Sequence, residues 1–118
     1  MASVQTGAVW QQIRRLLGRG PVAGLSDAEL LDRYATGRDE SAFEALVALH
    51  GPMVAGVCRR RLDDPRDVED AFQATFLVLV RRAGSLGPGA AVGPWLYGVA
   101  CRVAMRARCV AADRKSVV

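Results

Sequence analysis

Residues 64–76, DPRDVEDAFQATF, carry the local signals that decide the fold. Asp64 can accept a hydrogen bond from a free backbone amide, and Pro65 suits the first helical position because its missing N–H would have no partner there. The acidic residues that follow favour the positive end of a helix dipole. Apolar residues then recur at helical spacing, and arginines at 81–82 lie near the expected negative end. The stretch predicts a helix from Pro65 to about Ala83.

Toward the N-terminus, the chain predicts two further helices. Residues 26–29, SDAE, form a capping box that opens a short helix, and Gly37 ends it. A second box, residues 41–44, is expected to open a longer helix. Pro52 lies inside the apolar pattern of that longer helix. Because proline lacks an amide donor and clashes with the preceding turn, we expect a kink or a break there.

Toward the C-terminus, residues 84–94 form an uncharged loop rich in glycine and proline, and Gly93-Pro94 is expected to start a last helix. The buried stripe of that helix is predicted at Trp95, Val99, Val103 and Val110. A further candidate helix runs from about Val4 to Leu17, before a glycine-rich break. No strand is predicted. The fold class is therefore all-α, a compact bundle of about four helices with an extra N-terminal helix.

The net charge of the 118-residue chain is +4, and it is unevenly distributed. Residues 1–21 carry +3, residues 22–70 carry −5 and residues 71–118 carry +6. A hydrophobic fraction of 51% is typical of a globular chain rather than a disordered one, and the length suits one domain. An acidic part followed by a basic part favours two surfaces for two different partners.

Several function classes find no support in the residues. His50 is the single histidine, and Cys58, Cys101 and Cys109 form no CxxC pair, so no metal site, cofactor or disulfide framework is predicted. We find no catalytic constellation and expect no enzyme. No apolar run reaches the length needed to cross a bilayer, and the first twenty residues lack a secretory cleavage site. We therefore expect a cytoplasmic chain without a membrane partner.

The last helix is the strongest candidate for nucleic-acid binding. Arg102 and Arg106 are four residues apart and share one face, whereas Arg108 and Lys115 are seven apart and share another. Arginine pairs with phosphates and guanine edges, and Tyr97 at the helix start could stack on an unpaired base. The structural alternative is that these basic residues only cover a solvent-exposed helix face, in a chain that uses arginine in preference to lysine.

The acidic start of the 65–83 helix is a second candidate surface. Asp67, Glu69 and Asp70 are explained adequately by compensation of the helix dipole. Gln73, on the same face, is less well explained in that way. These four residues are therefore a second candidate surface, with helix-dipole compensation as the structural alternative.

Three blocks of the sequence resemble region two of the bacterial RNA polymerase sigma factors, of the compact extracytoplasmic-function type. They are residues 42–46 (AFEAL) with 50–52 (HGP), residues 64–76, and residues 94–100 (PWLYGVA). The blocks keep the family's order and spacing between about Ser26 and Lys115. The resemblance implies a sigma-factor domain that docks on core RNA polymerase and binds and melts the promoter −10 element during initiation.

In that family, the helix that carries the middle block docks on the coiled coil of the polymerase clamp. The resemblance thus assigns Asp70 and Gln73, with Asp67 and Glu69 nearby, to polymerase contact. The residue after the glutamine is usually glutamate in the family, whereas this chain has Ala74, so its acidic surface has one carboxylate fewer.

The loop and the last helix of the family bind the −10 element, with bases flipped from the melted non-template strand. The resemblance implies this role for the 84–94 loop, Tyr97, Arg102 and Arg106. The family commonly has Asn where Arg102 stands and Asp where Arg106 stands, so a promoter preference does not carry over. We expect this helix to rely more on phosphate contacts.

The resemblance also divides the chain. Residues 1–24 are expected to form an N-terminal helical extension and linker, and residues 25–115 the region-two domain, with the family's region-four domain absent. Promoter DNA and core polymerase are the implied partners, and an anti-sigma protein is a further candidate. Two alternatives stay open: a protein-interaction module that binds polymerase or an anti-sigma protein without directing initiation, and a free-standing helical repressor.

Overall fold

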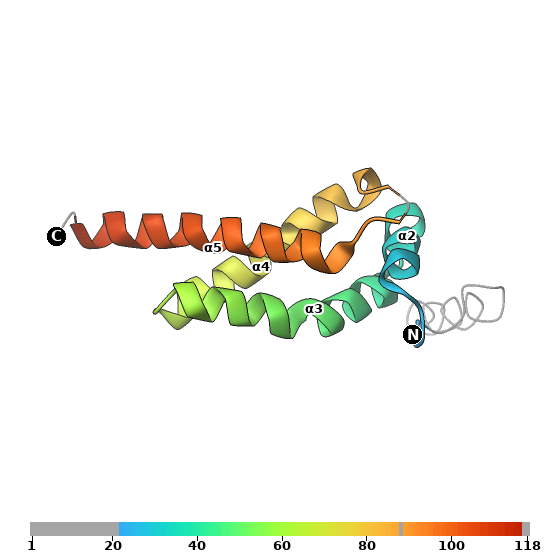
Figure 1. The fold of residues 1–118 in the computed structure, drawn as a ribbon, viewed down its shortest axis with the longest axis horizontal. Helices are drawn as coiled ribbons and strands as arrows, with labels where there is room; N and C mark the ends of the chain where they lie inside the picture. Colours follow the sequence, from blue (N-terminus) through green and yellow to red (C-terminus); the bar gives the residue numbers. More distant parts are fainter. Residues whose placement is uncertain (1–21, 88, 117–118) are drawn as a thin grey trace, which may run out of the picture.

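The computed structural model describes residues 22–87 and 89–116, and these form a bundle of α-helices without a strand (Figure 1). The helices are α2 (Asp27–Gly37), α3 (Glu40–Arg61), α4 (Pro65–Arg82) and α5 (Val92–Ser116), with a short 3₁₀ turn, η1 (Ala83–Ser85), after α4. The predicted all-α bundle of about four helices is confirmed. The helix expected over residues 4–17 lies outside the described residues.

α4 begins where the sequence predicts. The Asp64 side chain accepts a hydrogen bond from the Arg66 amide at 2.9 Å, and Pro65 occupies the first turn. The helix ends at Arg82, one residue before the predicted end, because the chain tightens into η1 there. The local signals of residues 64–76 therefore suffice to place this helix.

α2 is held at both ends by local contacts. Ser26 accepts from the Glu29 amide at 3.2 Å, and the Glu29 carboxylate accepts from the Ser26 amide at 3.1 Å, which completes the predicted capping box. The hydrogen bond from the Ser26 backbone lowers the pKa of the Glu29 carboxyl. Gly37 is the last helical residue, and Arg38 caps the helix in the left-handed conformation, with φ at 49°.

α3 departs from the prediction in two ways. It begins at Glu40, because Asp39 rather than Ser41 is the N-cap and accepts from the Ser41 amide at 3.1 Å. It also continues through Pro52, so that of the predicted kink or break, the break does not occur. Pro52 and Ala48, whose carbonyl has no helical partner, are both exposed, so water can replace the missing hydrogen bond.

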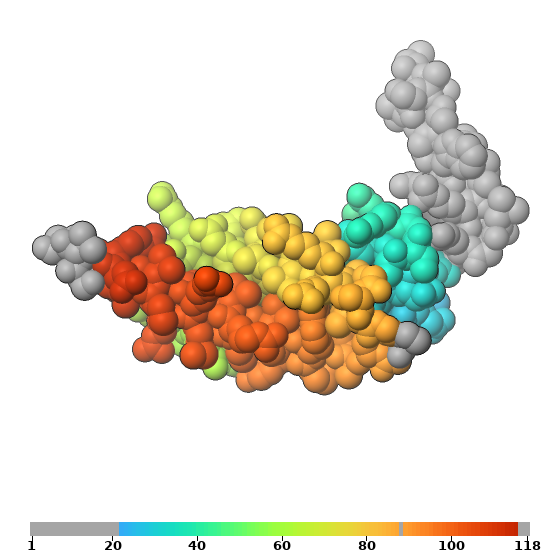
Figure 2. Space-filling view, turned by 90° about the horizontal axis from the view of Figure 1, so that it is seen from above, coloured from blue at the N-terminus to red at the C-terminus, as the bar shows by residue number. Residues whose placement is uncertain are grey.

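The core lies where α5 packs against α3 and α4, and Figure 2 shows α4 and α5 side by side from above. The buried side chains of α5 are Val92, Leu96, Val99, Ala100 and Ala104. Trp95 and Val103 are half-buried, and Val110 is 52% exposed, so the predicted stripe is wrong at its C-terminal end. Burial stops there because α5 extends past the end of α3 (Figure 1).

A small set of contacts brings α2, α3 and α5 together. The His50 ring hydrogen-bonds the Asp27 carboxylate, with 2.9 Å between Nε2 and Oδ2. A Cβ at Gly93 would lie 3.5 Å from the same ring, so α5 begins directly against His50. Next to it, a Cβ at Gly51 would lie 3.6 Å from the Phe72 ring. His50 and Gly51 therefore lie where α3 contacts α2, α4 and α5.

Among the described residues, α3 alone is long and apolar enough to cross a membrane by length and composition. About a third of its apolar window, 33%, is buried inside the bundle. Helices that line the core of a bundle meet the same criterion, so this finding is weak support for a membrane role.

Leu96 tests the packing of α5, because its side chain is fully buried at 0% exposure. Leu96→Ala should lower the free energy of unfolding by about 3 kcal/mol, because apolar burial is removed and a cavity is left behind. Urea denaturation followed by circular dichroism measures the change. Leu49→Ala is the matched control, since Leu49 is 58% exposed and its truncation should change stability by less than about 0.5 kcal/mol. Equal effects in the two variants would contradict this packing.

Candidate functional site

The acidic and amide residues of α4 do not all share one environment. Glu69, Asp70 and Gln73 are exposed, and their spacing of one, three and four residues places them on one face of α4. Asp67 differs, because its side chain is only 16% exposed. Three of the four predicted protein-binding residues therefore form an open surface, and the fourth does not.

Asp67 is held by an arginine from the far end of the chain. Arg114, near the end of α5, donates from one guanidinium nitrogen to both carboxylate oxygens of Asp67, at 3.0 and 3.1 Å. The contact joins the last turns of α5 to the first turn of α4. The sequence alone does not predict this pair, since 47 residues separate its members and neither helix reveals the other's position.

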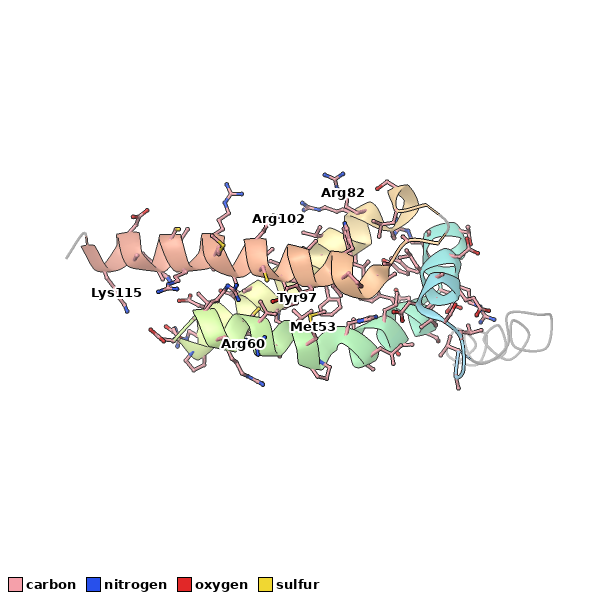
Figure 3. The ribbon with its side chains drawn as sticks, viewed as in Figure 1. Met53, Arg60, Arg82, Tyr97, Arg102 and Lys115 are labelled. Carbon is pink, nitrogen blue, oxygen red and sulfur yellow. The ribbon has the colours of Figure 1, made fainter. Side chains whose placement is uncertain are left out.

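The basic residues of α5 lie along two edges of the helix. Tyr97, Arg108 and Lys115 are spaced by eleven and seven residues, about three and two turns, and so follow one line. Arg102 and Arg106 follow another line. All five are exposed, and Figure 3 shows Arg102 and Lys115 projecting from opposite sides of α5. The structure therefore divides the candidate nucleic-acid residues into two groups.

The two edges offer different chemistry. Tyr97, 47% exposed, projects from the side of α5 next to α3, where the half-buried Met53 also lies (Figure 3). An exposed aromatic ring suits stacking on a base. On the other edge, Arg102 lies back along the helix, with its guanidinium 3.4 Å from where a Cβ of Gly98 would be. Trp95, seven residues before Arg102, follows the same line but is half-buried, so the exposed groups of that edge are the two arginines, which suit phosphates.

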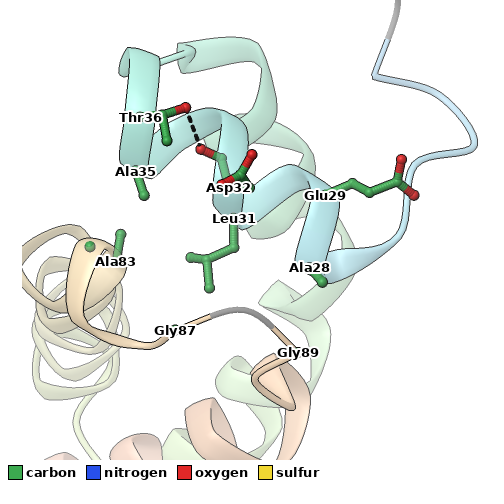
Figure 4. Close-up of a pocket in the computed structure, with 10 residues that line it drawn as sticks. Ala28, Glu29, Leu31, Asp32, Ala35, Thr36, Ala83, Gly87 and Gly89 are labelled. Carbon is green, nitrogen blue, oxygen red and sulfur yellow. Dashed lines mark hydrogen bonds between the residues drawn. The ribbon is translucent and has the colours of Figure 1, made fainter.

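A groove of about 490 Å³ opens between α2 and residues 83–89, beside the glycine-rich loop that the sequence predicts (Figure 4). Gly87 and Gly89 adopt φ values of 69° and 79°, which side chains rarely tolerate, so this loop conformation requires glycine. Glu29 and Asp32 line the α2 side. These carboxylates disfavour a phosphate and favour a neutral group that donates hydrogen bonds.

The described residues offer neither a reactive thiol at Cys58 nor a cluster of metal ligands. Burial, and the neighbouring Cys101, raise the pKa of the Cys58 thiol, which therefore stays protonated inside the core. Over residues 22–87 and 89–116, no group of three or more His, Cys, Asp or Glu side chains could hold a metal ion.

The sigma-70 region 2 family matches residues 46–109, more than half of the chain. The chain belongs to this family. It is 38% identical over 74 residues to the RNA polymerase sigma factor CarQ of Myxococcus xanthus. It is 36% identical over 74 residues to the ECF RNA polymerase sigma factor SigM of Mycobacterium tuberculosis. No solved structure matches the chain at a significant level.

These alignments cover 63% of this chain, but only 42% of CarQ and 37% of SigM. The chain thus spans about two fifths of the length of the curated relatives it matches. The family to which the sequence blocks pointed is confirmed. Sigma factors are non-enzymatic transcription regulators, which agrees with the interpretation of the sequence.

The sigma-70 region 2 match runs from Leu46 in α3 to Cys109 in α5. It includes the exposed face of α4 and four of the five candidate DNA-binding residues. Lys115 and the Arg114–Asp67 contact reach beyond it at the C-terminal end. The last turns of α5 are therefore the part of the candidate site that the family match does not cover.

The Asp67–Arg114 pair should contribute modestly to stability, because the Arg114 side chain is 63% exposed. A double-mutant cycle with Asp67→Ala and Arg114→Ala should give a coupling free energy of about 0.5–1 kcal/mol that falls as salt is added. Urea denaturation at low and high salt measures it. A coupling of zero at low salt would show that the pair does not hold α5 to α4.

Proposed function

We propose that this chain is the promoter-recognition domain of a sigma factor of the extracytoplasmic-function type. In this proposal α4 docks on core RNA polymerase, and α5 with the preceding loop binds and helps to melt the promoter −10 element. The observation that supports this proposal is that α4 exposes acidic and amide side chains on one face, whereas α5 exposes basic side chains along two edges. The names of CarQ and SigM as sigma factors support the same role.

For the polymerase contact, the proposal relies on Glu69, Asp70 and Gln73. Their exposure on one face leaves carboxylates and an amide free to meet a basic partner surface such as the polymerase clamp coiled coil. Asp67 stays a weaker candidate, since its carboxylate is already bound to Arg114. Its contribution would come from holding α5 beside α4.

For promoter DNA, we propose that the two edges of α5 contact different chemical groups of the strand. The edge with Tyr97, Arg108 and Lys115 would take unpaired bases together with their phosphates. Arg102 and Arg106 would supply phosphate contacts on the other edge. The groove beside the 84–94 loop, with its carboxylates on α2, would accept a neutral group such as a base edge.

The proposal also covers the cellular location, a further partner and the domain boundary. Sigma factors act on DNA and polymerase, so we place the chain in the cytoplasm. An anti-sigma protein is a further proposed partner. The domain boundary at residue 25 remains a prediction.

The polymerase contact is tested with the Asp70→Lys/Gln73→Ala double variant of the full chain. Its affinity for core RNA polymerase should fall at least about tenfold, since a charge reversal places like charges together at the interface. Fluorescence anisotropy of labelled chain titrated with core polymerase measures the affinity. Unchanged affinity, with folding shown by circular dichroism, would refute the docking site.

The DNA contact is tested on the chain held by core polymerase. Arg102→Ala/Arg106→Ala should weaken binding to a single-stranded −10 oligonucleotide and flatten the logarithmic salt dependence by about 0.7 for each phosphate that is no longer neutralised. Tyr97→Ala should weaken binding with little change in that slope, because stacking releases no counterions.

Arg59→Ala is the matched control for the DNA measurements. Arg59 is an exposed arginine of α3 that suits the C-terminal end of the helix dipole, so its removal should leave both affinity and slope unchanged. Polymerase binding without any effect of the α5 variants on DNA would favour the interaction module over the promoter-recognition domain.

A further inference from the structure

Residues 76–80, Phe-Leu-Val-Leu-Val, are five consecutive apolar residues in α4. A helix turns by about 100° per residue, so five successive side chains cannot all face one core. Phe76 and Leu79 are buried, whereas Leu77 is 54% exposed. The bundle therefore uses part of this run and leaves one large apolar side chain in solvent.

Leu77 lies in line with the residues proposed to contact polymerase. Asp70, Gln73, Leu77 and Arg81 are spaced by three, four and four residues, and all four are exposed. This spacing follows one side of an α-helix, over about 16 Å at 1.5 Å per residue. We call these four residues the α4 stripe. It presents, in order, an acid, an amide, an apolar group and a base.

The other exposed apolar side chains lie elsewhere. Among the described residues, Leu49 is on α3, and Tyr97, Met105 and Val110 are on α5. An isolated exposed leucine is ordinary on a protein surface. Leu77 differs in its position, one turn after Gln73 and two turns after Asp70, inside a surface that already offers polar contacts.

Charged groups at a rim mainly direct association, whereas a few side chains that lose their water near the centre of an interface carry most of the binding free energy. Glu69 and Asp70 alone would give a salt-sensitive contact. In the α4 stripe, Leu77 lies between Asp70 and Arg81 and adds an apolar side chain to a surface that is otherwise polar. Its polar surroundings also set the register of a partner, which must bring a basic group opposite Asp70.

We propose that Leu77 is the apolar anchor of the contact with core RNA polymerase. The partner surface would carry an apolar side chain or pocket for Leu77, with a basic group opposite Asp70 and an acidic group opposite Arg81. This inference rests on the proposed docking of α4. It adds a specificity-determining residue that comes from the apolar run and not from the acidic block.

The test is the affinity of the full chain for core RNA polymerase, measured by fluorescence anisotropy at low and high salt. Leu77→Ala should weaken binding at least about fivefold, and the factor should persist at high salt, because apolar burial is not screened. Leu77→Met should stay within about twofold of the unaltered chain, since methionine conserves volume and apolar character. Circular dichroism and urea denaturation confirm that the variants fold.

Leu49→Ala is the matched control, the same truncation at a leucine that is 58% exposed on a different helix. Unchanged affinity for Leu49→Ala together with weaker binding for Leu77→Ala supports the anchor. Equal weakening at both positions, or none at Leu77, overturns it.

The Asp70→Lys/Gln73→Ala variant separates this inference from the docking proposal. If that variant weakens binding and Leu77→Ala does not, the docking stands and the anchor is wrong. If neither variant weakens binding, both are wrong. If only Leu77→Ala weakens binding, the anchor stands and the acidic contact is wrong.

Discussion

Close packing of α5 against α3 and α4 is the constraint on which the exposed surfaces depend. Ala100 and Ala104 are fully buried, and such small side chains allow neighbouring backbones to approach closely. Once that line of α5 faces inward, the remaining positions of the helix are determined by its period. Tyr97 must then lie on one edge and Arg102 on the other. The side chains that α5 exposes on each edge therefore follow from the small side chains that it buries in the core.

The sequence predicted most of the fold because its signals are local. Capping residues, proline at a first turn and helical spacing act within a few residues, and they placed α2 and α4 almost to the residue. Predictions failed where the outcome depends on distant parts of the chain. The solvent exposure of Ala48 and Pro52 decided that α3 stays continuous, and the end of the core decided that Val110 is exposed.

The same distinction applies to the candidate site. Exposure of Asp70, Gln73 and the α5 cations could be predicted from helical periodicity and charge. The engagement of Asp67 could not, because its partner, Arg114, lies 47 residues away on another helix. The exposure of Leu77 could not be predicted, for a similar reason. A run of five apolar residues indicates burial of the segment but does not say which member the bundle leaves outside.

The composition of the α5 edges also determines which modifications can alter the charge that the proposed DNA contact uses. Three of their four cations, Arg102, Arg106 and Arg108, are arginines, which carry a guanidinium group and no primary amine. Acetylation, which neutralises an amine, can act only on Lys115. Acetylation can therefore remove at most one of the four charges that the proposed DNA contact uses.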